Sequence, residues 1–88
     1  MLNDPPNDAQ AVALNALAAT LADQRLAERF LSLSGLTPPD LRHRAAEPRF
    51  LAEFLHFLEA NEADLLAIAD RISVKPEQLV IARHVLES

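Results

Sequence analysis

The chain contains no cysteine, no tyrosine and no tryptophan, and it has a single glycine among its 88 residues. The absence of cysteine excludes a disulfide framework, a thiolate metal site and a thiol nucleophile. One glycine cannot supply a glycine-rich loop of the kind that binds phosphate groups. Composition alone therefore excludes several common site chemistries.

Positive charge is also scarce, because eight lysines and arginines stand against thirteen aspartates and glutamates, for a net charge of -5. Domains that bind nucleic acid usually carry a basic face, so this balance argues against a nucleic-acid partner. The first residues carry acids where a signal peptide needs lysine or arginine. The apolar runs fall far short of the ~18 residues of a membrane span. We therefore expect a cytoplasmic protein with no membrane association.

Alanine and leucine, both strong helix formers, are abundant, and no segment shows the alternating pattern of a strand. This pattern predicts an all-α fold: a compact single-domain bundle of five or six short helices. Residues 8–88 form the predicted domain, and residues 1–7 form a flexible N-terminal leader. The predicted helices cover about 8–22, 24–34, 38–46, 48–60 and 62–72, with a last helix from residue 76.

The most apolar segment runs from Pro48 to Glu59. Its phenylalanines and leucines recur at spacings of three and four: Phe50, Leu51, Phe54, Leu55, Phe57 and Leu58. The narrow polar edge consists of Arg49, Glu53, His56 and Ala60. A helix with so wide an apolar surface needs cover on most sides. We expect it at the centre of the bundle, and a second copy of the chain is one way to complete its cover.

Local signals mark the ends of these helices. The predicted N-caps are Asn7, Asp23, Thr37 and Asn61. Prolines stand at first helical positions, namely Pro38, Pro48 and Pro76. Gly35 is predicted to end the second helix as the left-handed residue of a Schellman motif.

Hydrophobic spacing also predicts which faces are buried. The buried stripe of the first helix is expected to be Leu14, Leu17, Ala18 and Leu21, with Asn15 and Thr20 on the outer side. Leu33 is expected to lie on the buried face of the second helix, and Leu66 on that of the fifth.

Residues 66–85 fit the spacing of a helix-turn-helix, with Ser73 at the usual turn glycine. The base-facing positions would be Pro76, Glu77, Val80 and Ile81. Base edges and phosphates require arginine, lysine, asparagine or glutamine at such positions, so the chemistry does not match the spacing. A helix-turn-helix-like, DNA-associated regulator is therefore kept as the alternative hypothesis. The simpler interpretation is two helices packed through a tight turn.

The last helix also offers a candidate partner surface. Glu77, Ile81 and His84 share one side of it, and Val80 flanks the buried stripe. Apolar residues exposed on an amphipathic helix can mark a partner surface. The leading hypothesis is a small non-catalytic interaction module that binds an unidentified protein or a second copy of itself.

Two other groups of residues are candidate sites. The basic cluster of Arg42, His43 and Arg44, with Arg49 nearby, either contacts an anion or offsets a helix dipole. Glu53 and His56 have the spacing of a di-metal bundle site, but the second copy that such a site needs is absent. No residues suggest a positioned acid, base or nucleophile, so we expect neither enzyme activity nor a cofactor nor a metal.

The chain resembles a short bacterial family, domain of unknown function 3572, found mainly in alphaproteobacteria. The resemblance covers about Ala9 to Leu86 and rests on Phe30-Leu31, Gly35-Leu36, Leu41-Arg42, Phe50-Leu51, Leu55-x-Phe57-Leu58, Asn61-Glu62, Leu65-Leu66 and the start of the last helix. Asn61 and Ser73 depart from it, because aspartate and glycine are expected there. The resemblance implies a bacterial cytosolic helical domain and brings no catalytic residues.

Overall fold

The computed structural model describes residues 5–88, and every regular element in that range is an α-helix. The helices are α1 (Pro5–Ala22), α2 (Gln24–Ser34), α3 (Pro38–Arg44), α4 (Pro48–Glu59), α5 (Glu62–Arg71) and α6 (Pro76–Glu87). The predicted all-α single domain is confirmed. Helix α1 begins at Pro5 rather than at Asp8, since proline is tolerated in a first turn. The remainder of the predicted leader, residues 1–4, lies outside the described residues.

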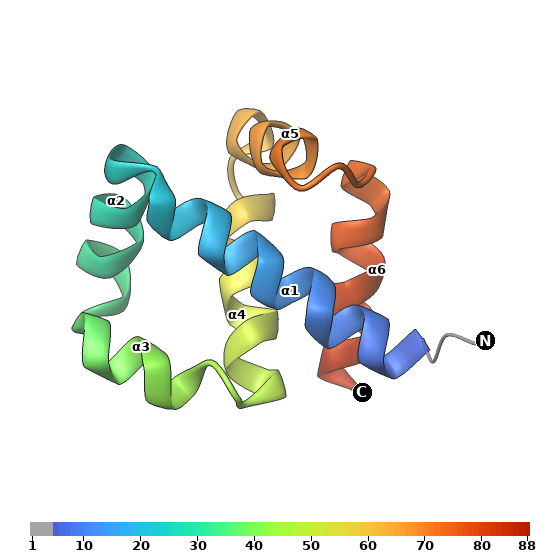
Figure 1. The fold of residues 1–88 in the computed structure, drawn as a ribbon, viewed down its shortest axis with the longest axis horizontal. Coiled ribbons are helices and arrows are strands. Elements are labelled where there is room, and N and C mark those ends of the chain that lie inside the picture. The colour runs from blue at the N-terminus through green and yellow to red at the C-terminus, as the bar shows by residue number, and fades with distance from the viewer. Residues whose placement is uncertain (1–4) are drawn as a thin grey trace.

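Helices α1, α4 and α6 pack against one another, and α4 and α6 share the most extensive packing of the fold (Figure 1). Helix α1 crosses in front of α4 and packs against α6, and α6 also packs along α4. Helix α5 closes one end, while α2 and α3 form an arm on the side away from α6. Within residues 5–88, no helix has the length and apolar character needed to cross a membrane.

Helix α4 is the central helix, as its sequence predicts. Its buried residues are Phe50, Leu51, Ala52, Phe54, Leu55 and Leu58. Arg49, Glu53 and His56 form an exposed edge. Because the helices of the same chain cover this apolar surface, α4 does not need a second copy for its cover.

Phe30 of α2 holds the arm against α4. Its ring centroid lies 6.2 Å from that of Phe50, 5.4 Å from that of Phe54 and 5.0 Å from that of Phe57. Such tilted and edge-on pairs each add roughly 0.5–1.5 kcal/mol beyond the area that they bury. The only other buried residues of the arm are Leu26 in α2 and Leu41 in α3.

The predicted buried face of α1 is confirmed for Leu17 and wrong for Leu14, Ala18 and Leu21. The residues that face the core are mostly small: Ala9, Ala13, Ala16, Leu17 and Thr20. Leu14 and Leu21 are instead 41% and 38% exposed. Small side chains let the α1 backbone approach its neighbours closely. Thr20 can be buried because its hydroxyl donates a hydrogen bond to the Ala16 carbonyl at 2.8 Å.

The helix ends largely match the predicted signals. Asp23 and Asn61 accept hydrogen bonds from backbone N–H groups of α2 and α5. Thr37 and Asp40 form a reciprocal capping box. Gly35 is left-handed (φ 72°), but its N–H donates to the Leu31 carbonyl at 2.9 Å, which makes an αL motif and not a Schellman motif.

A Schellman motif occurs at Ser73, between α5 and α6. Val74 N–H donates to the Ala69 carbonyl at 2.9 Å and Ser73 N–H to the Asp70 carbonyl at 3.2 Å. Ser73 has φ 61°, so the position where the pattern expects glycine has a left-handed backbone. This tight turn gives α5 and α6 their helix-turn-helix-like connection.

Candidate functional site

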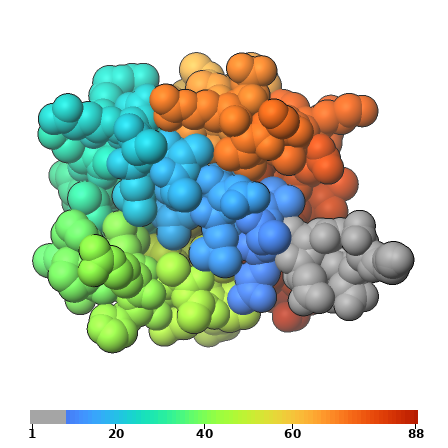
Figure 2. All heavy atoms as spheres, in the orientation of Figure 1, coloured from blue at the N-terminus to red at the C-terminus, as the bar shows by residue number. Residues whose placement is uncertain are grey.

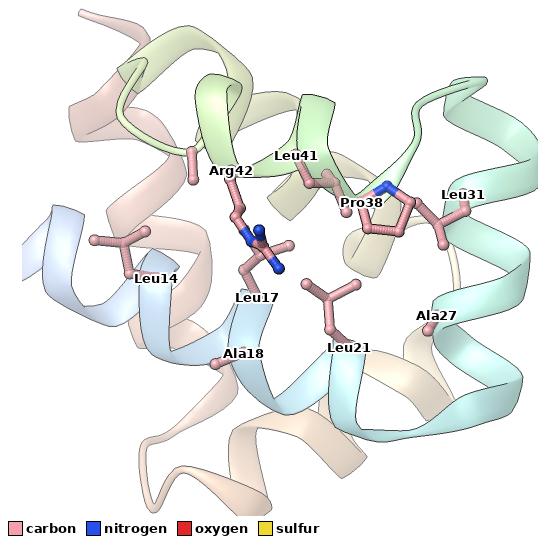
Figure 3. Close-up of a pocket in the computed structure, with 10 residues that line it drawn as sticks. Leu14, Leu17, Ala18, Leu21, Ala27, Leu31, Pro38, Leu41 and Arg42 are labelled. Atoms are coloured by element: carbon pink, nitrogen blue, oxygen red, sulfur yellow. The ribbon is translucent and has the colours of Figure 1, made fainter.

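A groove of about 460 Å³ lies between α1, α2 and α3 (Figure 3). Its lining consists of Leu14, Leu17, Ala18, Leu21, Ala27, Leu31, Pro38, Leu41, Arg42 and Ala45. We call it the α1–α2–α3 groove. Atoms of all three helices lie on the face of the molecule seen in Figure 2.

The stripe of α1 that was predicted to be buried forms one wall of this groove. Leu14, Ala18 and Leu21 are spaced four and three residues apart, which places them on one side of a helix. All three are exposed, whereas Leu17 beside them is buried. The groove therefore contains an apolar stripe that the described chain covers only in part.

The turn between α2 and α3 forms the opposite wall. The left-handed Gly35 ends α2, and the Thr37 cap starts α3 in a new direction. Pro38 at the first helical position then lies across the groove from Leu21, with Leu31 on the α2 side (Figure 3). The glycine stop, the threonine cap and the proline of this wall are all predicted by the sequence. The opposite wall, the leucine stripe of α1, is expected in the core instead.

Arg42 is the one charged side chain in the lining of the α1–α2–α3 groove. It extends from α3 toward α1 and lies among the leucines (Figure 3). It makes no ion pair with any residue of the described chain. The groove therefore combines an apolar surface with one unpaired positive charge.

The other residues of the predicted basic cluster do not converge on Arg42. Arg44 pairs with Glu47 at 3.0 Å, and its guanidinium lies 5.2 Å from the centroid of the Phe50 ring. Arg49 lies with Glu53 and His56 at another cavity, and His43 is exposed. The structure therefore does not bring the four together into one anion site.

A second groove, of about 440 Å³, lies between α2 and α4. Its lining includes the rings of Phe30, Phe50 and Phe57 beneath the exposed Leu33. Leu33 is 72% exposed, so the prediction that it is buried is wrong, and so is that for Leu66, which is 48% exposed. This groove carries charges of both signs, including Arg44 and Glu53, several of them already paired.

The predicted partner surface on α6 is only partly exposed. Glu77, Ile81 and His84 are exposed, with Ile81 at 60%, and Val80 is half-buried. The arginine of this helix, Arg83, is occupied by ion pairs with Glu59 and with Glu87, the latter at 3.0 Å. The exposed side of α6 therefore presents acidic and aliphatic groups, and its role in binding stays a prediction.

His56 joins α4 to α6. Its Nε2 lies 2.7 Å from a carboxylate oxygen of Glu87, although the imidazole is 54% exposed. This hydrogen bond, together with the charge of Arg83, lowers the pKa of the Glu87 carboxyl below its ordinary value. In residues 5–88, no three potential ligands gather as a metal site would require. The arrangement is a clamp between two helices.

Fold and groove together define a small all-helical domain with an apolar groove on its surface. The chain belongs to the family described as protein of unknown function (DUF3572), whose model matches residues 6–88. No curated protein and no solved structure matches the chain. The family resemblance predicted from the sequence is thus confirmed, while the alphaproteobacterial origin stays a prediction.

Proposed function

We propose that this protein is an interaction module that binds an α-helix of a partner protein in the α1–α2–α3 groove. The supporting observation is the exposed stripe of Leu14, Ala18 and Leu21. On most amphipathic helices the larger apolar residues face the core. On α1 the core-facing residues are mostly alanines, whereas Leu14 and Leu21 are partly exposed to solvent.

The spacing of the stripe favours a helix as the occupant. Residues at i, i+4 and i+7 lie along one face of a helix, the arrangement by which one helix packs on another. Peptide helices bind in apolar grooves through anchors at the same spacing. A partner helix lying along α1 would contact α2 and α3 on its far side.

The binding should be of moderate strength. Completing the burial of two leucines that are 41% and 38% exposed contributes roughly 1 kcal/mol each. The remaining wall adds to this, while association costs at least about 4 kcal/mol. The two leucines alone do not offset this cost, so most of the binding energy must come from the remaining wall and the rest of the contact, and we expect a reversible complex.

Selection from a displayed library of amphipathic helical peptides tests the proposal. The selected peptides should bind the wild-type protein and lose binding to Leu21→Glu, because the new carboxylate lies on the groove wall. The matched control is Ile81→Glu, the same change at an exposed aliphatic on α6. Circular dichroism should show that both variants keep the helical fold.

The opposite result would support the surface predicted from the sequence. If Ile81→Glu abolished peptide binding and Leu21→Glu did not, the partner surface would be on α6. Cytoplasmic location and the absence of catalysis remain predictions from the sequence.

A further inference from the structure

Arg42 shares its lack of an ion pair with Arg25, Arg49 and Arg71 in the described residues, and it differs from them by its place in the α1–α2–α3 groove. Arg29, Arg44 and Arg83 each have a carboxylate partner within the chain. Arg42 has none in the described residues and lies in the α1–α2–α3 groove. Because Arg42 has no ion pair among the described side chains and lies beside a candidate docking surface, its charge is available to a partner.

Arg42 stands in the last turn of α3, where its charge suits the helix dipole, but none of the hydrogen bonds of the described residues has its side chain as a helix cap. A basic residue in a last turn can bond the final carbonyls of its helix or offset its dipole. The carbonyl of Leu41 instead receives the backbone N–H of Ala45 at 2.8 Å. The Arg42 side chain extends toward α1 and away from the helix end (Figure 3).

The surroundings of Arg42 would strengthen its attraction for a carboxylate. Every other residue lining the groove is apolar. A helix seated on those residues would exclude water, and Coulomb interactions are stronger where the local dielectric constant is lower. The net charge of -5 disfavours acidic partners in general, and within the groove the one charged side chain is positive.

We infer that the partner helix carries an acidic side chain, one turn or less from its apolar face, that pairs with Arg42. This inference rests on the proposed function. The leucine stripe provides the apolar contact, and Arg42 selects acidic helices over neutral or basic ones and sets their orientation along α1. An arginine can hold a carboxylate through two parallel hydrogen bonds, which makes such a contact specific in geometry as well as charge.

The test uses a displayed library of helical peptides that share one leucine face and carry glutamate, glutamine or lysine at the flanking positions. Selection on the wild-type protein should enrich glutamate at one flanking position. A synthetic peptide with that glutamate should bind about tenfold more tightly than its glutamine twin. The difference should vanish in Arg42→Gln and reverse in favour of lysine in Arg42→Glu.

Two control variants separate this inference from the proposed function. Arg49→Gln makes the same change at an exposed arginine of α4 outside the groove and should keep the glutamate preference. Leu21→Glu could abolish binding while the glutamate and glutamine peptides bind the wild-type protein equally well. In that case the groove is the binding site, and the role inferred for Arg42 is wrong. If Leu21→Glu has no effect, both proposals are wrong.

Discussion

Ser73 has a backbone conformation that serine seldom adopts. At φ 61° the Cβ of an L-residue is crowded by neighbouring backbone, at a cost of about 1 kcal/mol or more. The hydrogen bonds of the Schellman motif hold it there, because they close the end of α5. The turn between α5 and α6 therefore retains strain that glycine would remove.

Ser73→Gly should stabilise the protein by about 0.5–1 kcal/mol, because the relief of strain exceeds the added entropy of the unfolded chain. Urea denaturation of the two proteins measures this difference. The matched control is Ser32→Gly, at an exposed position within α2, where the same change should destabilise by a similar amount. Loss of stability at residue 73 would show that the serine side chain contributes something the backbone argument omits.

Residue size explains where sequence reasoning about α1 failed. Leucine outranks alanine in hydrophobicity, so the stripe through Leu14 and Leu21 was assigned to the core. Which face is buried also depends on how well it fits the neighbouring helices. The alanine face lets α1 lie closer to α4 and α6 than the leucine face would. Thr20 was assigned outward for its hydroxyl, although a helical carbonyl satisfies that group.

At the scale of elements, capping residues and prolines predict the helices of the fold well. Prolines and capping residues placed most helix ends within two residues of the observed ones. The α1–α2–α3 groove was not predicted, because it depends on the angle at which α3 returns toward α1. One feature of the sequence could have indicated the groove: α1 has two apolar stripes, one mainly of alanines and one mainly of leucines, and only one of them can face the core.

One ion pair joins the arm to the rest of the molecule. Arg29 of α2 pairs with Asp64 of α5, whose side chain is only 6% exposed, and the guanidinium lies 5.2 Å from the centroid of the Phe57 ring. Asp64 also stands in the first turn of α5, where a negative charge is favoured. This pair connects two helices that are far apart in sequence.

Arg29→Met should destabilise the protein by about 2 kcal/mol, because it leaves the Asp64 carboxylate buried without a partner. This figure is below that of a fully buried pair, since the Arg29 side chain is 35% exposed. Adding Asp64→Leu should recover part of the loss, as chemical denaturation would measure. As a control, Glu47→Gln breaks an exposed pair and should change stability by no more than about 0.5 kcal/mol. A double variant less stable than Arg29→Met would contradict the argument.

At the scale of the whole molecule, stability should fall in acid. The His56 hydrogen bond and the Arg83 charge lower the pKa of Glu87, and hydrogen bonds from Thr37 lower that of Asp40. A carboxyl whose pKa is lower in the folded state stabilises the fold above its unfolded pKa. That contribution is lost as pH falls through the folded pKa.

Glu87→Gln should therefore flatten the loss of stability below the ordinary glutamate pKa of 4.5. Thermal unfolding at a series of pH values, compared with the wild type, measures this change. Glu53→Gln, an exposed change on α4, is the control and should retain the wild-type acid response. Identical curves for Glu87→Gln and the wild type would show that the clamp does not contribute.

The DNA hypothesis has a direct test at the same scale. We expect no change in the fluorescence anisotropy of a labelled DNA duplex at micromolar protein, because α6 presents no free arginine or lysine in its described residues. The titration is run at low and at physiological salt. Binding that weakens steeply with salt would instead indicate phosphate contacts and favour the helix-turn-helix hypothesis.

The contact between α1 and α6 also bears on how the protein is made. The alanine face of α1 leaves the ribosome well before α6 exists, at roughly 5–20 residues per second. Until α6 is synthesised, α1 lacks the helix against which its alanine face packs. Helix α4 also lacks one of its main packing partners. We therefore expect the core to be completed only when α6 is present. A chain shortened before α6 should fail to fold stably and should be prone to proteolysis.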